Sequence, residues 1–257
     1  MDIGYSFLQV EDDGEVARIV LRRPPLNVLH LEMVRELLRA VDGLRAEDGL
    51  RVLVIAAEGK VFSAGVAVED HLPQRASVML PAFHDVFRRL RALSVPTIAA
   101  VQGAALGGGC ELACFADLVI ASERASFGLP EVRLASFPPI AAVHFPHRIG
   151  LARTLQMVLS GDVLPAAEAA RIGLVDAVVP GPELAGAVQA QVQKLREKSG
   201  PALRLARRAV LQAVGRGFED GLREAERLFL DELMKTDDAV EGLGAFLEKR
   251  PPVWRHR

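Results

Sequence analysis

Apolar and polar residues alternate with two different periods in the first half of the chain. Short apolar or β-branched stretches, which are typical of strands, occupy residues 5–11, 15–23, 51–58, 97–103 and 117–127. The first two are joined by the sequence Asp-Asp-Gly, which predicts a β-hairpin. Apolar side chains at helical spacing predict helices over residues 30–44 and 76–93. Strands that alternate with helices indicate an α/β fold with βαβ-type connections.

Helical periodicity dominates the second half of the chain, from about Leu151 onwards. Helix-like stretches occupy residues 151–161, 165–173, 182–198, 201–215, 219–234 and 238–249. Residues 174–179 form the only stretch of this half with the pattern of a strand. We therefore expect a mixed α/β core over residues 1–198, followed by a helical C-terminal region over residues 199–257.

The composition is that of an ordinary globular protein, with 257 residues of which 50% are hydrophobic and 25% are charged. The net charge of -2 gives no strong field toward nucleic acid or an anionic membrane. No apolar run approaches the roughly 18 residues of a membrane span, and the acidic N-terminal sequence has no leader pattern. Cys110 and Cys114 show neither metal-ligand spacing nor a disulfide framework. We therefore expect a cytoplasmic protein without a nucleic-acid or membrane partner.

Three consecutive glycines, Gly107 to Gly109, interrupt an apolar stretch and are followed closely by Glu111. The segment does not fit the dinucleotide-binding pattern, whose third glycine would fall on Leu112, and it lacks the Lys and Ser or Thr of a phosphate-binding loop. Glycines between a strand and a helix let a ligand approach the first N–H groups of the helix, which can bind an anionic oxygen. The alternative is that the glycines allow close helix packing and that Glu111 complements the helix dipole.

Two further segments could complete such a site. Glu131 lies among the apolar residues of "SFGLPEVRL", and two carboxyls in apolar surroundings can acquire different pKa values that give one acid and one base. A glutamate after Pro130 is otherwise typical of a surface turn. The loop "KVFSAGVAVEDH" follows a predicted strand, and the backbone N–H of Val66 could be a second donor to an anion. Taken alone, this segment is an ordinary loop.

In this order, the segments resemble the enoyl-CoA hydratase/isomerase (crotonase) superfamily over nearly the whole chain. The sequence "GAALGGGCELACFADLVIAS" is close to its most specific signature, "VFSAGVAV" to its first oxyanion loop and "ASFGLPEV" to the segment of its second glutamate. The stretch "RIVLRRPPLNVLHLEMVREL" is similar to its N-terminal strand and helix, and "GLGAFLEKRPPVW" to its C-terminal helix and tail.

The resemblance implies a spiral of ββα units with a helical C-terminal region that mediates assembly into a trimer, or into a hexamer of two trimers. It implies an acyl-CoA thioester as the ligand, with coenzyme A as part of the substrate and no separate cofactor or metal. The thioester oxygen would accept hydrogen bonds from the backbone N–H groups of Val66 and Gly108. Glu111 and Glu131 match the two catalytic glutamates, and the presence of both favours a hydratase in which Glu111 activates water and Glu131 protonates carbon.

The chain departs from the family pattern beside these residues. Ala67 stands where the family often has Asp, in the loop that is expected, with Ala64, to contact the substrate and the adenine of coenzyme A. Farther along, where many hydratases have a glycine-rich stretch, this chain has "ASFPPIAAVHFPHRIG". Phe137, Pro138 and Pro139 are therefore expected to reshape and stiffen the acyl pocket.

The sequences "FSAGVAVEDH" and "FPP" are similar to those of the cyclohexa-1,5-diene-1-carbonyl-CoA hydratases of anaerobic benzoyl-CoA degradation. These enzymes add water to a conjugated cyclic dienoyl thioester. The alternatives are a short-chain enoyl-CoA hydratase with an altered pocket, and isomerisation or hydrolysis on the same scaffold. No matching motif carries the Ser/His/Asp arrangement of the related Clp-type proteases.

A few other polar residues call for an interpretation. His144 and His147 have no third metal ligand in the sequence pattern, and His71 is expected to be a solvated loop residue near the pocket mouth. Lys249 is a candidate contact to the phosphates of coenzyme A, from its own or a neighbouring subunit. Basic residues between 194 and 216 alternate with apolar ones at helical spacing, which favours a solvated helix face over the RNA binding known for some family members.

Overall fold

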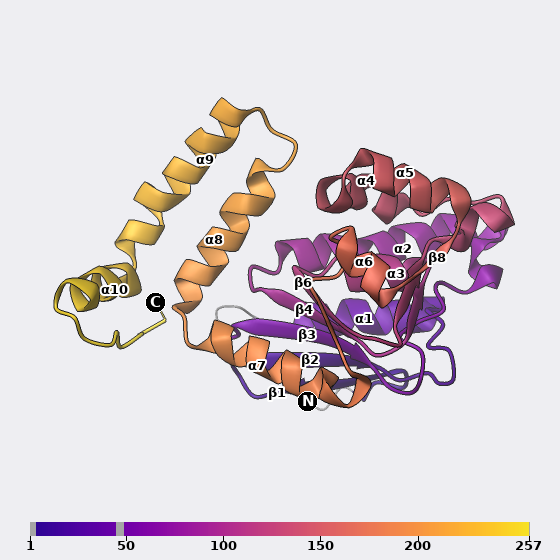
Figure 1. The fold of residues 1–257 in the computed structure, drawn as a ribbon, viewed down its shortest axis with the longest axis horizontal. Coiled ribbons are helices and arrows are strands. Elements are labelled where there is room, and N and C mark those ends of the chain that lie inside the picture. Colours follow the sequence, from indigo (N-terminus) through magenta and orange to yellow (C-terminus); the bar gives the residue numbers. More distant parts are fainter. Residues whose placement is uncertain (1–3, 45–48, 257) are drawn as a thin grey trace.

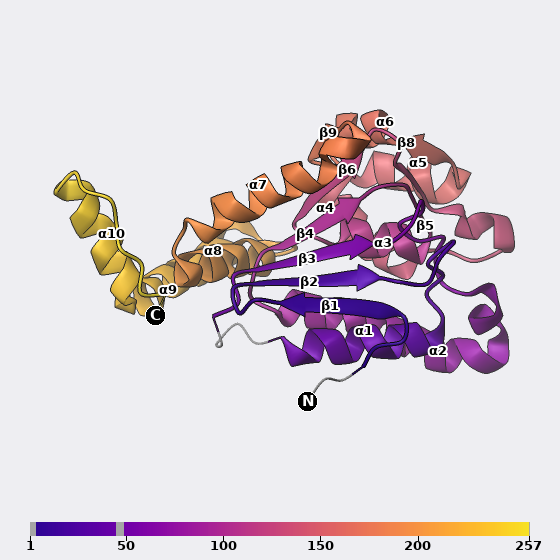
Figure 2. The same cartoon turned by 90° about the horizontal axis from the view of Figure 1, so that it is seen from below.

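The computed structural model describes residues 4–44 and 49–256, and its centre is a six-stranded sheet (Figures 1 and 2). Strand β1 pairs with β2 in the predicted antiparallel hairpin, and β2, β3, β4, β6 and β9 run parallel to one another in this sheet. In spatial order the strands are β1 (Leu8–Asp12), β2 (Val16–Leu21), β3 (Val52–Ala57), β4 (Thr97–Val101), β6 (Leu118–Ser122) and β9 (Ala177–Val179). The α/β architecture predicted from the alternating patterns is confirmed.

Helices cover both faces of this sheet, which explains the continuous apolar character of its central strands. Helices α1 (Leu31–Gly43) and α2 (Pro73–Ala92) lie against one face, and α7 (Leu184–Arg196) lies against the other (Figure 2). Along β3, Leu53 belongs to the core shared with α1 and α2, whereas the next residue, Val54, packs with α7. Successive side chains of a strand point to opposite faces, so one strand contributes to both cores.

A second, three-stranded sheet consists of β5 (Ala104–Leu106), β7 (Ser126–Gly128) and β8 (Val163–Pro165). Strand β8 corrects the prediction that residues 174–179 contain the only strand of the second half. It is three residues long, ends in a proline and pairs antiparallel with β7. Such a short strand depends on its tertiary partner, because its own sequence has no strand-like run.

Short helices and turns lie around the small sheet and the cavity beside it. They are η1 (Val68–His71), α3 (Gly108–Cys114), η2 (Pro130–Leu134), α4 (Pro139–Ile149), α5 (Leu151–Ser160) and α6 (Ala166–Arg171), where η marks a 3-10 turn. Two further 3-10 turns lie elsewhere: η3 (Gly181–Glu183) contacts α7, and η4 (Leu233–Lys235) contacts the three C-terminal helices. Helix α4 forms in a proline-containing stretch for which the sequence pattern predicted no helix. Pro139 is its first residue, a position at which the missing N–H of proline is not needed.

Three C-terminal helices extend to one side of the core (Figure 1). They are α8 (Gly200–Ala213), α9 (Phe218–Asp231) and α10 (Asp237–Leu247), and they confirm the predicted helical periodicity. The division of the chain into residues 1–198 and 199–257 stays a prediction. Within the described ranges, no helix is both long enough and apolar enough to cross a bilayer.

Candidate active site

The glycine segment joins β5 to α3 and brings three segments of the chain into close contact. Gly107 has a φ of 52°, which favours glycine, and a Cβ on it would lie 2.9 Å from Oε1 of Glu131. A Cβ on Gly108 would lie 2.7 Å from Cγ2 of Val66 and 2.9 Å from Cζ of Phe83. The glycines therefore permit close packing, and this packing places the start of α3 beside both Val66 and Glu131.

Two backbone N–H groups at this contact have no hydrogen-bond partner in the part of the chain that the structure describes, those of Val66 and Gly108. Gly108 is the first residue of α3, so no carbonyl of an earlier helical turn reaches its N–H. The loop of Val66 is fixed by two bonds, from Leu29 N–H to Gly65 O at 2.9 Å and from Ala67 N–H to Leu29 O at 3.2 Å. Both bonds use the neighbours of Val66, which leaves its own N–H available to a ligand.

Glu111 is 2% exposed and lies in the first turn of α3. Its Oε1 accepts the backbone N–H of Ala141, in the first turn of α4, at 2.9 Å. Burial raises the pKa of its carboxyl to about 8; the N–H groups of Ala141 and Ile140 oppose this shift, and the charge of Glu131 adds to it. The carboxyl is therefore mostly protonated at neutral pH and can exchange a proton there.

Glu131 lies in the turn η2 and is partly buried. Burial raises the pKa of its carboxyl, while its own backbone N–H and the charge of His71 lower it. Oε2 of this carboxyl is buried and has no hydrogen-bond partner in the described ranges. The side chain of Glu131 faces the cavity described next, so it is more than a residue of a surface turn.

A cavity of about 670 Å³ brings most of the predicted site residues together. Its lining includes Ala64, Val66, Gly108, Glu111, Glu131, Phe137, Pro138 and Pro139. Helix α2 supplies the opposite wall, including the buried residues Met79 and Phe83. Apart from Glu111 and Glu131, the titratable groups of the lining are His71 and Arg133. The cavity is thus largely apolar, with two carboxyls and two N–H donors at one place on its surface.

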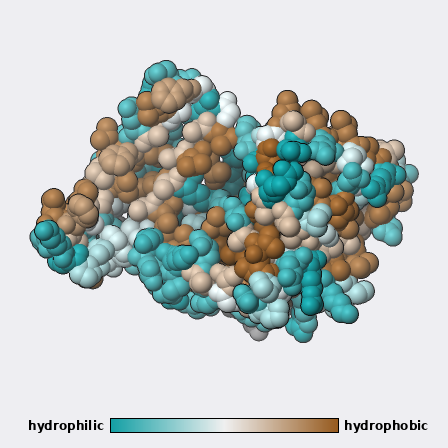
Figure 3. All heavy atoms as spheres, viewed as in Figure 1, coloured by the Kyte–Doolittle hydropathy of each residue, from teal (hydrophilic) through white to brown (hydrophobic). Residues whose placement is uncertain are grey.

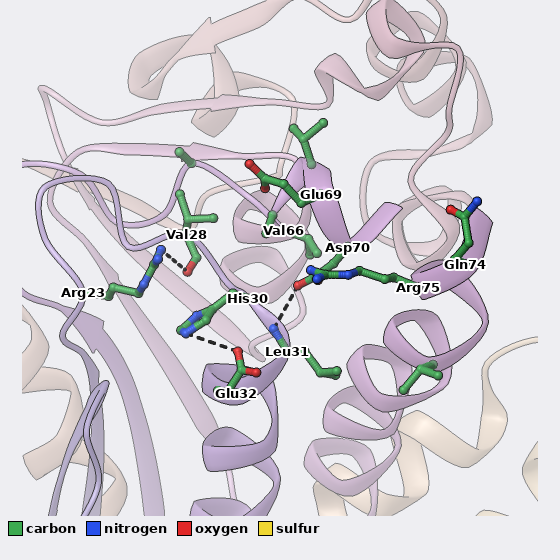
Figure 4. Close-up of a pocket in the computed structure, with 14 residues that line it drawn as sticks. Arg23, Val28, His30, Leu31, Glu32, Val66, Glu69, Asp70, Gln74 and Arg75 are labelled. Carbon is green, nitrogen blue, oxygen red and sulfur yellow. Dashed lines mark hydrogen bonds and ion pairs between the residues drawn. The ribbon is translucent and has the colours of Figure 1, made fainter. Parts of the chain in front are cut away.

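A second cavity, of about 810 Å³, shares Ala64, Val66 and Val68 with the first, and Figure 4 shows the residues that line it. The predicted residue Ala67 lines this second cavity and not the first. Charged side chains surround it, and several are paired: His30 with Glu32 at 3.5 Å, and Arg75 with Asp70 at 3.2 Å. The remaining charged groups of its lining are Arg23 and Glu69, and Arg23 donates to the carbonyl of Val28.

Lys249, His144 and His147 line neither of these cavities. Lys249 follows α10 and lines neither cavity, so a contact to the ligand within its own chain is not supported. His144 and His147 line a separate cavity between α4 and α8. Burial lowers the pKa of His144 to about 4, and the centre of its ring lies 4.8 Å from that of Phe115. No group of three or more potential metal ligands exists within residues 4–44 and 49–256.

Sequence reasoning missed the α2 side of the first cavity. It also expected His71 to be a solvated residue near the mouth of the pocket, whereas His71, although exposed, belongs to the cavity lining. Met79 and Phe83 lie on the apolar stripe of a helix, and such a stripe looks the same whether it meets a core or a ligand. His71 follows the loop of Val66 closely in sequence, and this short distance was the available signal for its position in the cavity lining.

The fold and this geometry define a class of protein: an enzyme that can stabilise negative charge on an oxygen by backbone N–H groups while two carboxyls move protons nearby. A sequence model of the enoyl-CoA hydratase/isomerase family matches residues 11–257. The chain belongs to this family, and it is a hydro-lyase of the enoyl-CoA hydratase type.

Similar proteins agree with the family and with the fold. The chain is 37% identical to cyclohexa-1,5-dienecarbonyl-CoA hydratase of Thauera aromatica, over 96% of both chains. It is 36% identical to a probable enoyl-CoA hydratase of Mycobacterium tuberculosis, over 98% of this chain and 99% of the relative. Among solved structures, enoyl-CoA hydratase subunit I of Geobacillus kaustophilus superposes with a TM-score of 0.92 at 34% identity, over 98% of this chain and 99% of that one. The crotonase fold expected from the resemblance is confirmed.

Proposed function

We propose that this enzyme adds water to an α,β-unsaturated acyl-CoA thioester whose acyl group is a cyclic conjugated diene. One observation carries the proposal: two carboxyls with raised pKa values, Glu111 and Glu131, share a cavity with the unpartnered N–H groups of Val66 and Gly108. The similarity to the Thauera aromatica hydratase supports the choice of a cyclic diene.

The two N–H groups hold the thioester oxygen. When water adds to the conjugated acyl group, electron density moves onto this oxygen, and the enolate-like state carries negative charge there. Donors from Val66 and Gly108 stabilise that charge more strongly than they stabilise the neutral carbonyl. Because the donors belong to the backbone, the side chains at these positions need no chemistry of their own.

The two glutamates handle the protons of the added water. Glu111 takes one proton as the water oxygen bonds to the β-carbon, and Glu131 gives one proton to carbon. In a cyclic 1,5-diene the electrons shift along the conjugated system. The hydroxyl therefore forms beside the carbon that bears the thioester, and the new C–H bond forms at the far end of the diene. The product is 6-hydroxycyclohex-1-ene-1-carbonyl-CoA.

This chemistry needs one ionised and one protonated carboxyl. Two coupled carboxyls share their protons, and the pair rather than either residue sets the pH dependence. In the free enzyme Glu111, the more buried carboxyl, is the one that burial favours most strongly in its protonated form. The division into base and acid given above therefore applies to the complex with water and thioester bound.

The cavity walls suit a compact, rigid acyl group. Pro138 and Pro139 have fixed φ angles and lead directly into α4, so this wall cannot fold back to admit a longer chain. Met79 and Phe83 are 1% and 3% exposed and close the opposite wall. Phe137 is 64% exposed in the free enzyme and can cover one face of a bound ring.

The coenzyme A part of the substrate would occupy the second cavity, because this cavity shares Ala64, Val66 and Val68 with the site of the thioester. Arg23 makes no ion pair among the described residues, so it suits a phosphate group. Ala67 lines the same cavity, where a side chain as small as alanine leaves room for the adenine.

We further propose that the enzyme is cytoplasmic and works as a trimer or as a hexamer of two trimers. Large apolar residues are exposed on the single chain, as the space-filling view shows for one face (Figure 3). On the C-terminal helices they include Phe218, Phe229, Leu230, Phe246 and Leu247. A monomer rarely exposes so much apolar surface, which supports assembly through these helices. In such an assembly Lys249, which follows α10, would be close to a neighbouring subunit.

The test follows the loss of the conjugated thioester absorbance with cyclohexa-1,5-diene-1-carbonyl-CoA and, separately, with crotonyl-CoA. The variants Glu111→Gln and Glu131→Gln serve as isosteric controls. Turnover of the cyclic diene alone, reduced to a small residual rate in both variants, is the expected result. Turnover of crotonyl-CoA instead would identify a general short-chain hydratase, as the similarity to the mycobacterial relative would also allow. Binding of both esters without turnover would overturn the hydratase proposal.

A further inference from the structure

His71 lies on the wall of the catalytic cavity, at the end of the turn η1 that follows the loop of Val66. Its side chain is exposed to solvent, and Nδ1 lies 2.9 Å from the carbonyl oxygen of Ala67. A carbonyl oxygen can only accept a hydrogen bond, so Nδ1 must carry a proton. Nε2 is therefore the ring atom that remains for another partner, as an acceptor when the ring is neutral and as a donor when it is charged.

Glu131 presents the matching unsatisfied group. Its Oε2 is buried without a partner among the described residues, whereas its Oε1 lies against Gly107. The charge of His71 lowers the pKa of this carboxyl, so the imidazole lies within electrostatic reach of it. An unpartnered buried carboxyl oxygen is unfavourable, and a hydrogen-bond donor or acceptor on the same cavity wall can satisfy it.

Apart from Glu131, the charged groups around His71 do not compete for this role. They are Glu69 and Asp70 on its own turn, Arg75 on α2, Glu111 on α3 and Arg133 on η2. Glu111 already accepts the backbone N–H of Ala141 at 2.9 Å. Asp70 and Arg75 pair with each other at 3.2 Å, and Arg133 pairs with Asp162 at 3.6 Å. Glu69 lines the second cavity and not the catalytic one. Glu131 is thus the carboxyl that shares the catalytic cavity with His71 and has an open hydrogen-bonding position.

We propose that His71 is a positioning residue for Glu131, with Nε2 hydrogen-bonded to Oε2 of the carboxyl, directly or through one water, during turnover. The inference rests on the proposed hydration, because it concerns the carboxyl that protonates carbon. A neutral ring accepts a hydrogen bond from the protonated carboxyl of Glu131, and a charged ring donates a hydrogen bond to its carboxylate. In both states the bond keeps the carboxyl aimed into the cavity.

Two substitutions separate the two nitrogens of the ring. In His71→Asn the shorter amide reaches the position of Nδ1 and keeps the bond to Ala67, but it offers nothing at Nε2. In His71→Gln the longer amide reaches the position of Nε2. We expect kcat to fall about 10- to 100-fold in the Asn variant and less than about fivefold in the Gln variant, with KM changed less than about threefold in both. His147→Asn, in the lining of the separate cavity beside α8, is the matched control and is expected to keep full activity.

A double-mutant cycle shows whether His71 acts through Glu131. In the Glu131→Gln background, His71→Asn is expected to cause no further loss of kcat. A loss equal to that in the wild-type background would overturn the proposal, and so would full activity of His71→Asn in the wild-type background.

A measurement without turnover keeps this inference separate from the proposed reaction. Titration of ¹³C-labelled glutamate carboxyls by NMR, with the signal of Glu131 identified by its absence in Glu131→Gln, reads the pKa of Glu131 directly. This pKa is expected to rise in His71→Asn, because the positive charge that lowers it is gone. If neither CoA ester is turned over but this shift is observed, the proposed reaction fails and the pairing of His71 with Glu131 stands. An unchanged pKa would overturn the pairing.

Discussion

The two sides of the catalytic cavity differ in how firmly the fold holds them. On one side, α3 is buried along its whole length, its glycines contact neighbouring segments, and Glu111 is tied to the first turn of α4. On the other side, the segment from Pro130 to Phe137 lies at the surface, and Leu134 and Phe137 are 66% and 64% exposed. Glu131 belongs to this second side and has a carboxyl oxygen without a partner.

The difference shows how one scaffold can keep its chemistry while its substrate changes. Charge stabilisation needs donors that do not move during the reaction, and a buried helix start provides them. Recognition of the acyl group needs walls that tolerate substitution, and an exposed segment provides these at little cost in stability. Glu131 stands at the boundary, so its position depends on contacts such as the one proposed with His71.

The strongest test of the rigid side is Gly108→Ala. The added methyl would lie 2.7 Å from Cγ2 of Val66 and 2.9 Å from Cζ of Phe83, so this contact must shift. Because Phe83 is buried, we expect the loop of Val66 to yield, which separates the two N–H donors. We expect kcat to fall about 10³-fold, in line with the loss of an oxyanion donor. Steady-state kinetics with the preferred CoA ester measures this effect. Gly186→Ala on α7, where a Cβ meets nothing within 4 Å, is the control, and equal losses in the two variants would refute the explanation.

Glu111→Gln is expected to make the folded protein more stable at pH 8. The folded-state pKa of about 8 lies above the ordinary value of 4.5, so stability is lost as the pH rises from 4.5 through 8 in the wild type. The loss is at most about 1.4 kcal/mol per pH unit, and the amide has its own burial penalty. We expect a gain in the free energy of unfolding of about 2 kcal/mol at pH 8 and none near pH 4.5, measured by urea unfolding at both values. A gain that does not depend on pH would contradict the titration of Glu111 as its cause.

The pH profile of the wild type tests whether the two sides act as one acid–base pair. Both carboxyls have raised pKa values, and the pair works with one proton. We expect kcat/KM to fall about tenfold per unit above a pH near 8, where the pair loses that proton, and to fall again on the acid side, where both carboxyls become protonated. A profile that stays flat from pH 6 to 10 would show that the carboxyls do not share the proton.

The smallest expected effect is at the exposed wall. Phe137→Ala removes apolar surface that can cover a ring, so kcat/KM for the cyclic dienoyl ester should fall about fivefold relative to crotonyl-CoA. The free energy of unfolding should change by less than about 0.5 kcal/mol, because the side chain is 64% exposed. Parallel kinetics with the two esters and one unfolding curve measure both quantities. A large loss of stability, with an unchanged ratio of kcat/KM for the two esters, would show that Phe137 supports the fold and does not contact the acyl group.

The helices and strands whose apolar residues recur with a clear period were predictable from the sequence. Those that depend on contacts with other segments of the chain were not. The amphipathic stripe of α1 and the apolar run of β3 predicted these elements because each sequence has one favourable way to bury its apolar side chains. Strand β8 is three residues long and is defined by its pairing with β7. Helix α4 contains Pro146, and its first turn donates to Glu111 from another helix. Neither contact is visible in the local sequence.

The candidate site shows the same limit. The motif around Gly107 to Gly109 and the segment of Glu131 indicated the two carboxyls and the two N–H donors. The role proposed for His71 did not follow from its sequence, because a histidine after a loop is usually solvated. Only the bond from its ring to the carbonyl of Ala67, and its place on the same wall as Glu131, distinguish it from an ordinary surface residue.

The sequence by itself determined the α/β class, the helical C-terminal region and the family, because periodicity and a glycine motif are local properties of the chain. The tertiary structure decided which groups act together. Glu111 and Glu131 are 20 residues apart, and Val66 is farther still, yet all three line one cavity because glycines without side chains let their segments touch. Burial in that cavity then raises the pKa values of both carboxyls, and burial is a property that no single segment has alone.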